Sequence, residues 1–350
     1  MLMQKYGACE FQAAVSNSSS RGSCHGQNFV LYAVQTEPVE RVSELSLSQN
    51  LARVQEHLDF ANLNEFFEVE SLPLAELTEL IRKRFDLVGS DLALIPHPRS
   101  LLWSYESSGY LMMQRTRLES AHRLPKVGED HKCYKLHGHG FEIDLYFTVN
   151  SSECLGSQQI NGASWWLVEN LHHKYLNEIE GLENPTSEIL SSWIFERLGS
   201  HCENLKAVRV WETESSGSLY LNDELHYSFK SFDMQSALQE APHGIFGHSY
   251  KVGVVLGMPL DHEMGWTIDF ARIKEQFEPL RKRLDHQDLS SIEGENLSND
   301  QDLVRWIYFQ SKDLIPGLKG IELRSMPGFG VRFGELSPVS PWSFLQGGGL

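Results

Sequence analysis

The sequence predicts an α+β protein built from three tandem modules, each with two strands, two helices and two more strands. One observation is a recurring segment. "LHHKYLNEIEGLENPTSEILSSWIFERL" in the middle third matches "LDHQDLSSIEGENLSNDQDLVRWIYFQS" near the C-terminus and "LDFANLNEFFEVESLPLAELTELIRKRF" near the N-terminus. A second is a glycine followed by an alternating strand, at Gly26, Gly138 and Gly247, which are 112 and 109 residues apart. One shared period at several landmarks indicates tandem repeats.

A third observation is a pair of residues that follows the first helix of each repeat. Each pair is 113 residues from the next: Asp59-Phe60, His172-His173 and Asp285-His286. We therefore expect three modules, at residues 1–115, 116–223 and 224–350.

Composition narrows the class of protein. The hydrophobic content of 41% and charged content of 22% are typical of a soluble globular chain. The formal net charge of −17 argues against a general nucleic-acid binder, which would need a basic face. The sequence has no apolar run long enough to span a membrane, and its N-terminus does not look like a secretory signal. With five cysteines and no paired spacing, we expect reduced thiols in a cytoplasmic protein.

Apolar spacing predicts the individual elements. In the third module, "SYKVGVVLGM" alternates like a half-buried strand, and "DHEMGWTID" makes a turn. The helix that follows carries one apolar face, which Pro279 is expected to interrupt. That face consists of Phe270, Ile273, Phe277 and Leu280.

In the second module, Asn184 followed by Pro185 predicts a helix N-cap with proline in the first turn. The helix after it has an apolar stripe that we interpret as core packing. The stripe consists of Ile189, Trp193, Ile194 and Leu198.

The segment "HKCYKLHGHG", residues 131–140, is rich in groups that bind metals. His137 and His139 are two residues apart and precede an alternating run, so they should point to the same side of a strand. The segment predicts a metal site with a thiol, Cys133, beside it.

These residues carry a resemblance. "LESAHRLP…HKCYKLHGHGFEIDLYF", "GLENPTSEIL" and "VRVWETESSG" resemble the superfamily of 6-pyruvoyl-tetrahydropterin synthase and 6-carboxytetrahydropterin synthase. The resemblance implies the tunnelling fold, in which three subunits close their sheets into one barrel. Three fused modules would then form a twelve-stranded pseudo-trimeric barrel. The close spacing of cysteine and His-Gly-His is similar to that in the bacterial 6-carboxy enzymes.

The resemblance implies three metal ligands, and the residue types agree. His122, His137 and His139 would supply imidazoles from two neighbouring strands. Three nitrogen ligands with an open fourth position are typical of catalytic zinc. Cys133 is the expected base, with its pKa lowered by the cation and by Lys132 and Lys135. In the alternative, Cys133 is a fourth ligand of a structural zinc.

Further roles are implied in the same way. Glu212 matches the glutamate that anchors the pterin ring, a role suited to a carboxylate that accepts two parallel N–H bonds. Thr186 matches a position that touches the pterin, although it could equally be a helix-end residue. The family's base is assisted by an aspartate–histidine pair, which the third module retains as Asp285 and His286. The middle module's own His173 is the alternative.

The other two modules have lost most of this site. We expect Ser236 and Phe246 to replace two ligands in the third module, which keeps His248, and Ser325 to replace the glutamate. We expect the first module to have no metal site. Its replacements are Val15 and Gln27 for two ligands, Phe60 for the histidine of the pair and Ser104 for the glutamate.

The implied activity is that of a zinc-dependent lyase, 6-carboxytetrahydropterin synthase. It would act on 7,8-dihydroneopterin triphosphate and release acetaldehyde and triphosphate, as in the synthesis of queuosine-type deazapurines. One composite site per chain would combine Zn²⁺, Cys133 and Glu212 of the middle module with Asp285 and His286 of the third. The alternatives are a pyruvoyl-type elimination of triphosphate and a non-catalytic pterin-binding scaffold. Besides the small-molecule substrate, the expected partner is a second copy of the chain, with no nucleic acid and no membrane.

Overall fold

In the computed structural model, the described residues are 1–16, 24–36, 44–105, 109–149, 158–240, 244–292, 295, 297–326 and 328–335. Among the described residues, no helix is both long and apolar enough to cross a membrane.

Twelve antiparallel strands close into one barrel, in which each strand pairs with its neighbours along the chain and β1 pairs with β12. The strands of the first module are β1 (Leu2–Val15), β2 (His25–Thr36), β3 (Asp91–His97) and β4 (Ser100–Ser104). Those of the second are β5 (Tyr110–His122), β6 (His137–Val149), β7 (Leu205–Thr213) and β8 (Ser216–Tyr220). Those of the third are β9 (His226–Glu240), β10 (Gly244–Met258), β11 (Leu318–Met326) and β12 (Phe329–Gly334). This confirms the predicted pseudo-trimeric barrel of three modules.

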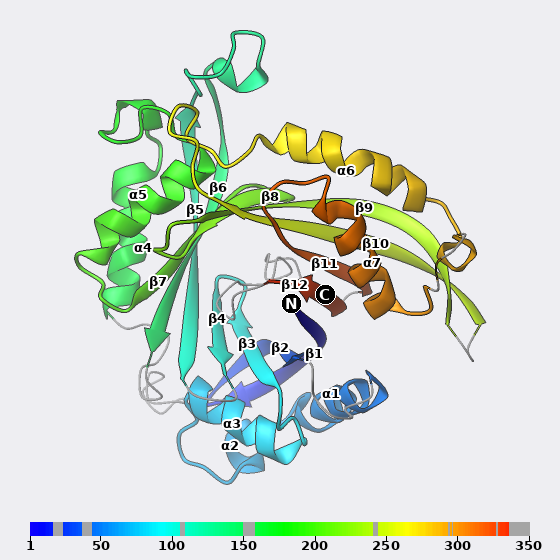
Figure 1. The fold of residues 1–350 in the computed structure, drawn as a ribbon. Helices are drawn as coiled ribbons and strands as arrows, with labels where there is room; N and C mark the ends of the chain where they lie inside the picture. Colours follow the sequence, from blue (N-terminus) through cyan, green and yellow to red (C-terminus); the bar gives the residue numbers. More distant parts are fainter. Residues whose placement is uncertain are drawn as a thin grey trace.

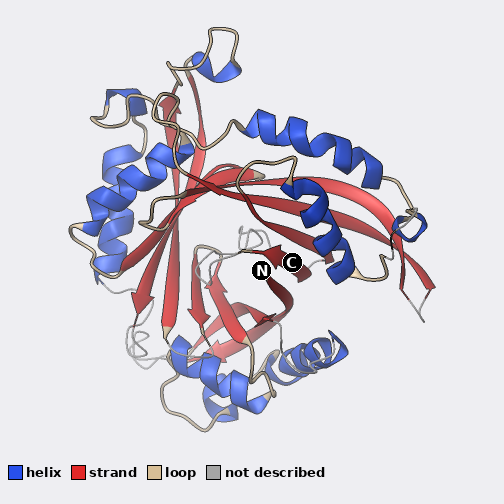
Figure 2. Cartoon of the chain, in the orientation of Figure 1, coloured by secondary structure: helices blue, strands red, loops and turns tan. Residues whose placement is uncertain are grey.

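Helices connect the second and third strands of each module and surround the ring of strands (Figure 2). The first module has α1 (Glu44–Leu58), the single turn α2 (Leu63–Phe66) and α3 (Leu74–Arg84). The second has α4 (Gln158–Leu171) and α5 (Ser187–Gly199), and the third has α6 (Phe270–Leu284) and α7 (Asp300–Lys312). Short 3₁₀ turns lie at Lys132–Tyr134, Leu176–Glu178 and Leu289–Ser291.

Alternation along the strands separates two kinds of core. Each module has its own hydrophobic cluster, in which alternate side chains of the strands pack against the helices on the outer face of the sheet. The buried members of a fourth cluster, among them Tyr6, Trp103 and Phe229, all come from strands and lie on the inner face of the barrel. Burial on both faces of the sheet accounts for the apolar strands of the sequence.

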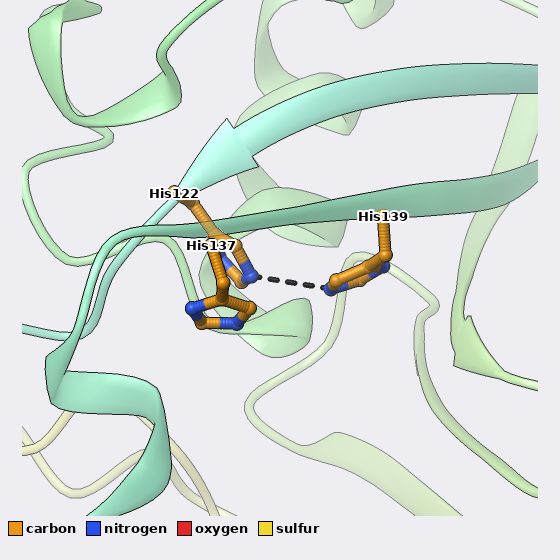
Figure 3. A group of neighbouring side chains, drawn as sticks. All are labelled: His122, His137 and His139. Atoms are coloured by element: carbon orange, nitrogen blue, oxygen red, sulfur yellow. Dashed lines mark hydrogen bonds between the residues drawn. The ribbon is translucent and has the colours of Figure 1, made fainter.

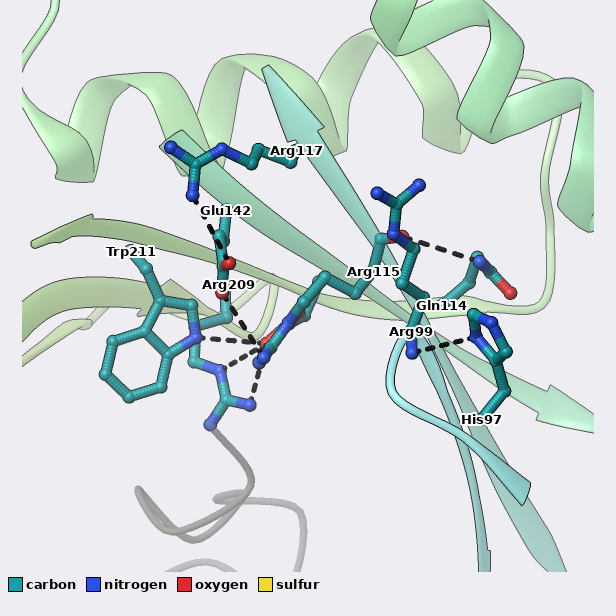
Figure 4. A network of polar contacts seen from close by, with 9 residues as sticks. His97, Arg99, Gln114, Arg115, Arg117, Glu142, Arg209 and Trp211 are labelled. Carbon is teal, nitrogen blue, oxygen red and sulfur yellow. Dashed lines mark hydrogen bonds and ion pairs between the residues drawn. The ribbon is translucent and has the colours of Figure 1, made fainter. Parts of the chain in front are cut away.

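The barrel interior also holds a buried ionic network (Figure 4). The carboxylate of Asp144, which is 0% exposed, accepts hydrogen bonds from Arg115 Nε (2.6 Å) and Arg209 Nε (2.9 Å). Trp211 Nε1 donates to the same carboxylate at 3.1 Å. Burial opposes the ionisation of Asp144, but the two guanidinium groups outweigh it and lower the pKa of the carboxyl group. The network ties β5, β6 and β7 together.

Several local expectations can be compared with the structure. Residue 115 lies inside β5, which begins at Tyr110, so the second module starts earlier than expected. Position 223 lies between β8 and β9, and residues 336–350 of the third expected module lie outside the described residues. Pro279 does not interrupt α6, which continues to Leu284.

The N-cap of α5 is Thr186, and not Asn184 as predicted. Its hydroxyl accepts from the backbone N–H of Ile189 at 3.2 Å. Pro185 therefore precedes the cap instead of starting the helix.

Candidate metal and pterin site

The three predicted histidines meet at one end of the barrel, where β5 ends and β6 begins (Figure 3). His122 pairs with His137 across the two strands, and His139 follows two residues later on the same face of β6. One ring nitrogen from each lies within 4.8 Å of the others. The Nε2 atoms of His122 and His139 are 3.2 Å apart. Tetrahedral ligands at roughly 2.0–2.1 Å from one zinc ion would be about 3.3 Å apart, so the spacing fits a shared ion.

Backbone carbonyls select the ring nitrogen that each histidine presents. The Nδ1 atoms of His122, His137 and His139 face the carbonyl oxygens of Pro185 (3.3 Å), Lys135 (2.7 Å) and Gly140 (3.0 Å). Carbonyls only accept, so these contacts favour the tautomer in which each Nδ1 donates and each Nε2 keeps its lone pair. Two such lone pairs cannot bond to each other, and the close Nε2 pair is instead suited to bind a cation between them.

Burial keeps two of these rings neutral. Desolvation, followed by the neighbouring histidines, lowers the pKa of His122 to about 4. Desolvation also lowers the pKa of His139. Neutral imidazole is the form that binds metal, so these rings stay competent as ligands in mildly acidic solution.

Cys133 lies half-buried in the short turn Lys132–Tyr134 that leads into β6. Its pKa is raised, first by burial and then by the negative charge of Glu212, although Lys132 opposes the shift. Lys132 by itself therefore does not bring the pKa of Cys133 below its usual value. A bound cation would be needed to favour the thiolate.

Glu212 lies near the end of β7, within electrostatic reach of Cys133. Its pKa is raised to about 7, first by burial and then by the nearby carboxylate of Glu188. Glu188 is itself buried and accepts hydrogen bonds from Ser228 Oγ (2.9 Å) and from the backbone N–H of Thr267 (3.2 Å). Glu212 and Cys133 therefore lie near each other. Ser228 and Thr267 of the third module line the same region through their hydrogen bonds to Glu188.

The loop before α6, from the third module, packs against the start of α5 on this side of the site. The Thr186 hydroxyl donates to the carbonyl of Gly265 at 2.5 Å, and the Asn184 side chain donates to that of Met264 at 2.7 Å. Asp269, the N-cap of α6, lies 3.4 Å from His131 Nε2. Thr186 is 4% exposed and performs the helix-end role, joining two modules. Sequence reasoning missed this loop because its contacts use backbone carbonyls.

Asp285 and His286 form the expected pair, with His286 Nδ1 3.2 Å from Asp285 Oδ1. They follow the C-terminal end of α6, whereas Asp269 precedes its N-terminal end. At 1.5 Å per residue, the helix separates Asp285 from Asp269 by roughly 24 Å. α6 runs away from the end of β5 and β6 (Figure 1). Within one chain, the structure does not bring this pair to the three histidines.

The first residue of each landmark pair has a structural role. Asp285 Oδ1 accepts from the backbone N–H of Gln235 at 2.8 Å, and Asp59 Oδ1 accepts from that of Gln12 at 2.9 Å. In the middle module, His172 Nδ1 accepts from the backbone N–H of Glu119 at 3.0 Å. His172 therefore preserves the hydrogen bond that aspartate makes in the other modules.

Strand register corrects two of the expected replacements. The bridges at Ala121 and Ala237 are equivalent, which places Leu238, and not Ser236, at the position of His122. In the first module, Ile95 pairs with Val30, and in the second, Trp211 pairs with Glu142, so Ile95 and Trp211 are equivalent. The next residue is Glu212 in the second module and Pro96 in the first, so Pro96 replaces Glu212. Ser104 instead lies at the end of β4. The replacements at Val15, Gln27, Phe60, Phe246 and Ser325 agree with the register.

The comparison with protein families decides the assignment. The model described as 6-pyruvoyl tetrahydropterin synthase matches residues 112–223 and again 226–333, which together are more than half of the chain. The chain belongs to the 6-pyruvoyl tetrahydropterin synthase family. The two matched ranges are the second and third modules of the barrel, and the first of them holds the three histidines.

Individual relatives are about one module long. The 6-carboxy-5,6,7,8-tetrahydropterin synthase of Synechocystis sp. is 33% identical over 126 residues, which cover 33% of this chain and 96% of the relative. The solved 6-pyruvoyl tetrahydropterin synthase of Caenorhabditis elegans is 15% identical, with a TM-score of 0.28 over 31% of this chain and 94% of its own. The solved 6-pyruvoyl tetrahydropterin synthase of Plasmodium vivax is also 15% identical, with a TM-score of 0.27, and the match covers 32% of this chain and 99% of that one.

Proposed function

We propose that the protein is a zinc-dependent 6-carboxy-5,6,7,8-tetrahydropterin synthase that acts on 7,8-dihydroneopterin triphosphate. The observation that carries the proposal is the convergence of ring nitrogens from three histidines, together with Cys133 and a half-buried Glu212 that lie within electrostatic reach of each other. The likeness to the Synechocystis enzyme in the same part of the chain favours the 6-carboxy reaction.

Each residue has a role that follows from its position. His122, His137 and His139 hold the ion, which when bound would make the side-chain hydroxyl and C–H protons of the substrate more acidic. Cys133 removes a proton from that side chain. Glu212, as a carboxylate, accepts the two N–H groups at the guanidine-like edge of the pterin and fixes its orientation. Thr186 positions the loop before α6 of the third module through its hydrogen bond to the carbonyl of Gly265.

The Asp285–His286 pair would reach the site only from a second copy of the chain. Its histidine side chain is 74% exposed and therefore available to another molecule. We propose a face-to-face homodimer in which each pair relays protons at the other chain's site. Mixing inactive Cys133→Ala with inactive His286→Ala should then restore part of the activity. If His286→Ala is fully active and His173→Ala is inactive, the pair is wrongly assigned.

The proposed reaction is tested by its products. Zinc-loaded protein incubated with dihydroneopterin triphosphate should yield 6-carboxytetrahydropterin, acetaldehyde and triphosphate in equal amounts, measured by mass spectrometry. Release of triphosphate without acetaldehyde would identify the pyruvoyl-type elimination instead. A protein that binds pterin but neither holds zinc nor turns substrate over would be the scaffold.

A further inference from the structure

Three lysines from two modules converge on the α6 end that faces the site. Lys230, on β9, places its Nζ 5.8 Å from the centre of the Phe270 ring, the first residue of α6. Lys274 lies one helical turn after Phe270 and therefore on the same face of α6. Lys132 directly follows His131, whose ring contacts the α6 cap Asp269.

Lys230 is the unusual member of this group. Its side chain is half-buried, and no carboxylate of the described chain lies within the 4.0 Å of an ion pair. Burial, followed by the positive charges of Lys132 and Lys274, lowers its pKa, while Glu212 and Asp269 act in the opposite direction. The two carboxylates therefore do not compensate for the burial and the two like charges, and a bound anion in contact with Lys230 would.

The three repeats provide an internal comparison. Gln114 on β5 and Gly7 on β1 occupy the position that Lys230 has on β9, as the strand pairing shows. Asn161 and Ser48 occupy the position of Lys274, ten residues before the end of the corresponding helix. The paired lysines therefore occur only at the boundary between modules that also has the three histidines. The barrel fold itself does not require them.

We propose that Lys132, Lys230 and Lys274 form a binding site for a polyphosphate chain, which holds the triphosphate of the substrate across the boundary between the second and third modules. The inference rests on the proposed function for the identity of the bound molecule, and it extends that function by assigning two lysines of the third module to the site. Several ammonium donors suit a flexible chain of phosphates because each contributes a point charge without demanding a fixed fork geometry.

The test is calorimetric binding of inorganic triphosphate to the zinc-loaded protein and to charge-removing variants. Loss of one charge-assisted contact should weaken binding about tenfold for Lys230→Met and severalfold for Lys274→Met. Lys230→Arg should retain most of the affinity. Lys282→Met, in the last turn of the same helix, is the matched control and should change the affinity less than twofold. Equal affinity of Lys230→Met, Lys274→Met and the control would overturn the proposal.

Turnover distinguishes this proposal from the proposed function. If the wild-type protein turns over dihydroneopterin triphosphate and Lys230→Met leaves KM unchanged, the lysine site is wrong and the proposed function stands. If no pterin is turned over but Lys230→Met still weakens triphosphate binding, the lysine site stands and the proposed function fails.

Discussion

Cys133 shows how strongly single residues depend on their surroundings. The lysines beside it in the sequence suggest an acidic thiol, yet burial and Glu212 shift its pKa the other way. The same local crowding raises the pKa of Glu212 to about 7. Glu212 therefore stands close to a change of ionisation at neutral pH, whereas the Cys133 thiol stays protonated unless a bound cation favours the thiolate.

The reactivity of Cys133 should distinguish a base from a metal ligand. Because a nearby cation favours the thiolate, we expect zinc to increase the rate at which iodoacetamide alkylates Cys133, followed by peptide mass spectrometry. Cys24, which is exposed, provides the reference rate. If zinc protects Cys133 from alkylation, the sulfur is the fourth ligand and the catalytic assignment fails.

Glu212 should impose a pH dependence on pterin binding. The pKa is raised, so the carboxylate that accepts two N–H groups forms only as the pH rises through about 7. Below that value, affinity for a pterin should fall by about tenfold per pH unit, as expected for one proton. Fluorescence titration of neopterin between pH 5 and 8 measures this. Glu212→Gln should bind weakly without this dependence, while exposed Glu214→Gln should behave like the wild type.

At the level of elements, the three modules share one backbone irregularity. The second residue of each landmark pair has a positive φ: 57° at Phe60, 56° at His173 and 58° at His286. Each follows a helix and leads into a segment that bridges to the first strand of its module. The left-handed residue turns the chain back to that strand, so the repeat preserves a conformation and not a side chain.

Phe60 offers a test of that conformation. Its side chain is 81% exposed, so Phe60→Gly removes left-handed strain while losing little buried surface. We expect the free energy of unfolding to rise by about 1 kcal/mol. Phe60→Ala keeps the strain and serves as the control. Urea denaturation compares the two, and equal stabilities would show that the conformation costs nothing there.

The metal ligands were expected from the His-Gly-His segment of the middle module and from the resemblance that it carries. The repeat period predicted the three modules, because a glycine at a strand start and a residue pair after the first helix recur at regular distances. It failed where a serine-rich turn occurs twice. "WSYESSG" at 103–109 looks like "WETESSG" at 211–217, yet the first joins two modules and the second joins β7 to β8. Turn residues specify a turn and not its place in the sheet. The buried network of Arg115, Asp144 and Arg209 was missed, although charged residues within apolar strands were its signal.

At the scale of the whole molecule, the boundaries between neighbouring modules of the barrel differ in the residues that line them. The boundary beside the histidines carries lysines and the α6 loop. At the boundary of β12 with β1, the two strands pair antiparallel and Arg332 Nε donates to Gln4 Oε1. Gly330 lies against Tyr6 there, and an added Cβ would come within 2.7 Å of the backbone oxygen of Leu323. Gly217 occupies the equivalent, equally crowded position in the second module.

Closure of the barrel can be tested at Gly330. We expect Gly330→Ala to lower the free energy of unfolding by about 1–3 kcal/mol through overpacking. Gly26→Ala is the control, because an added Cβ at Gly26 meets nothing within 4 Å. Chemical denaturation followed by circular dichroism measures both. If the two variants are equally stable, the space at Gly330 is not limiting.

The pairing of β1 with β12 has a consequence for the order in which the strands can pair during folding. Leu2 pairs with Gly334, so the first and last strands of the barrel lie side by side (Figure 1). During synthesis, one edge of β1 must wait for nearly the entire polypeptide to emerge from the ribosome. Contacts so distant in sequence form slowly, so the nascent chain carries an unpaired edge that chaperones would be expected to shield until the last strand arrives.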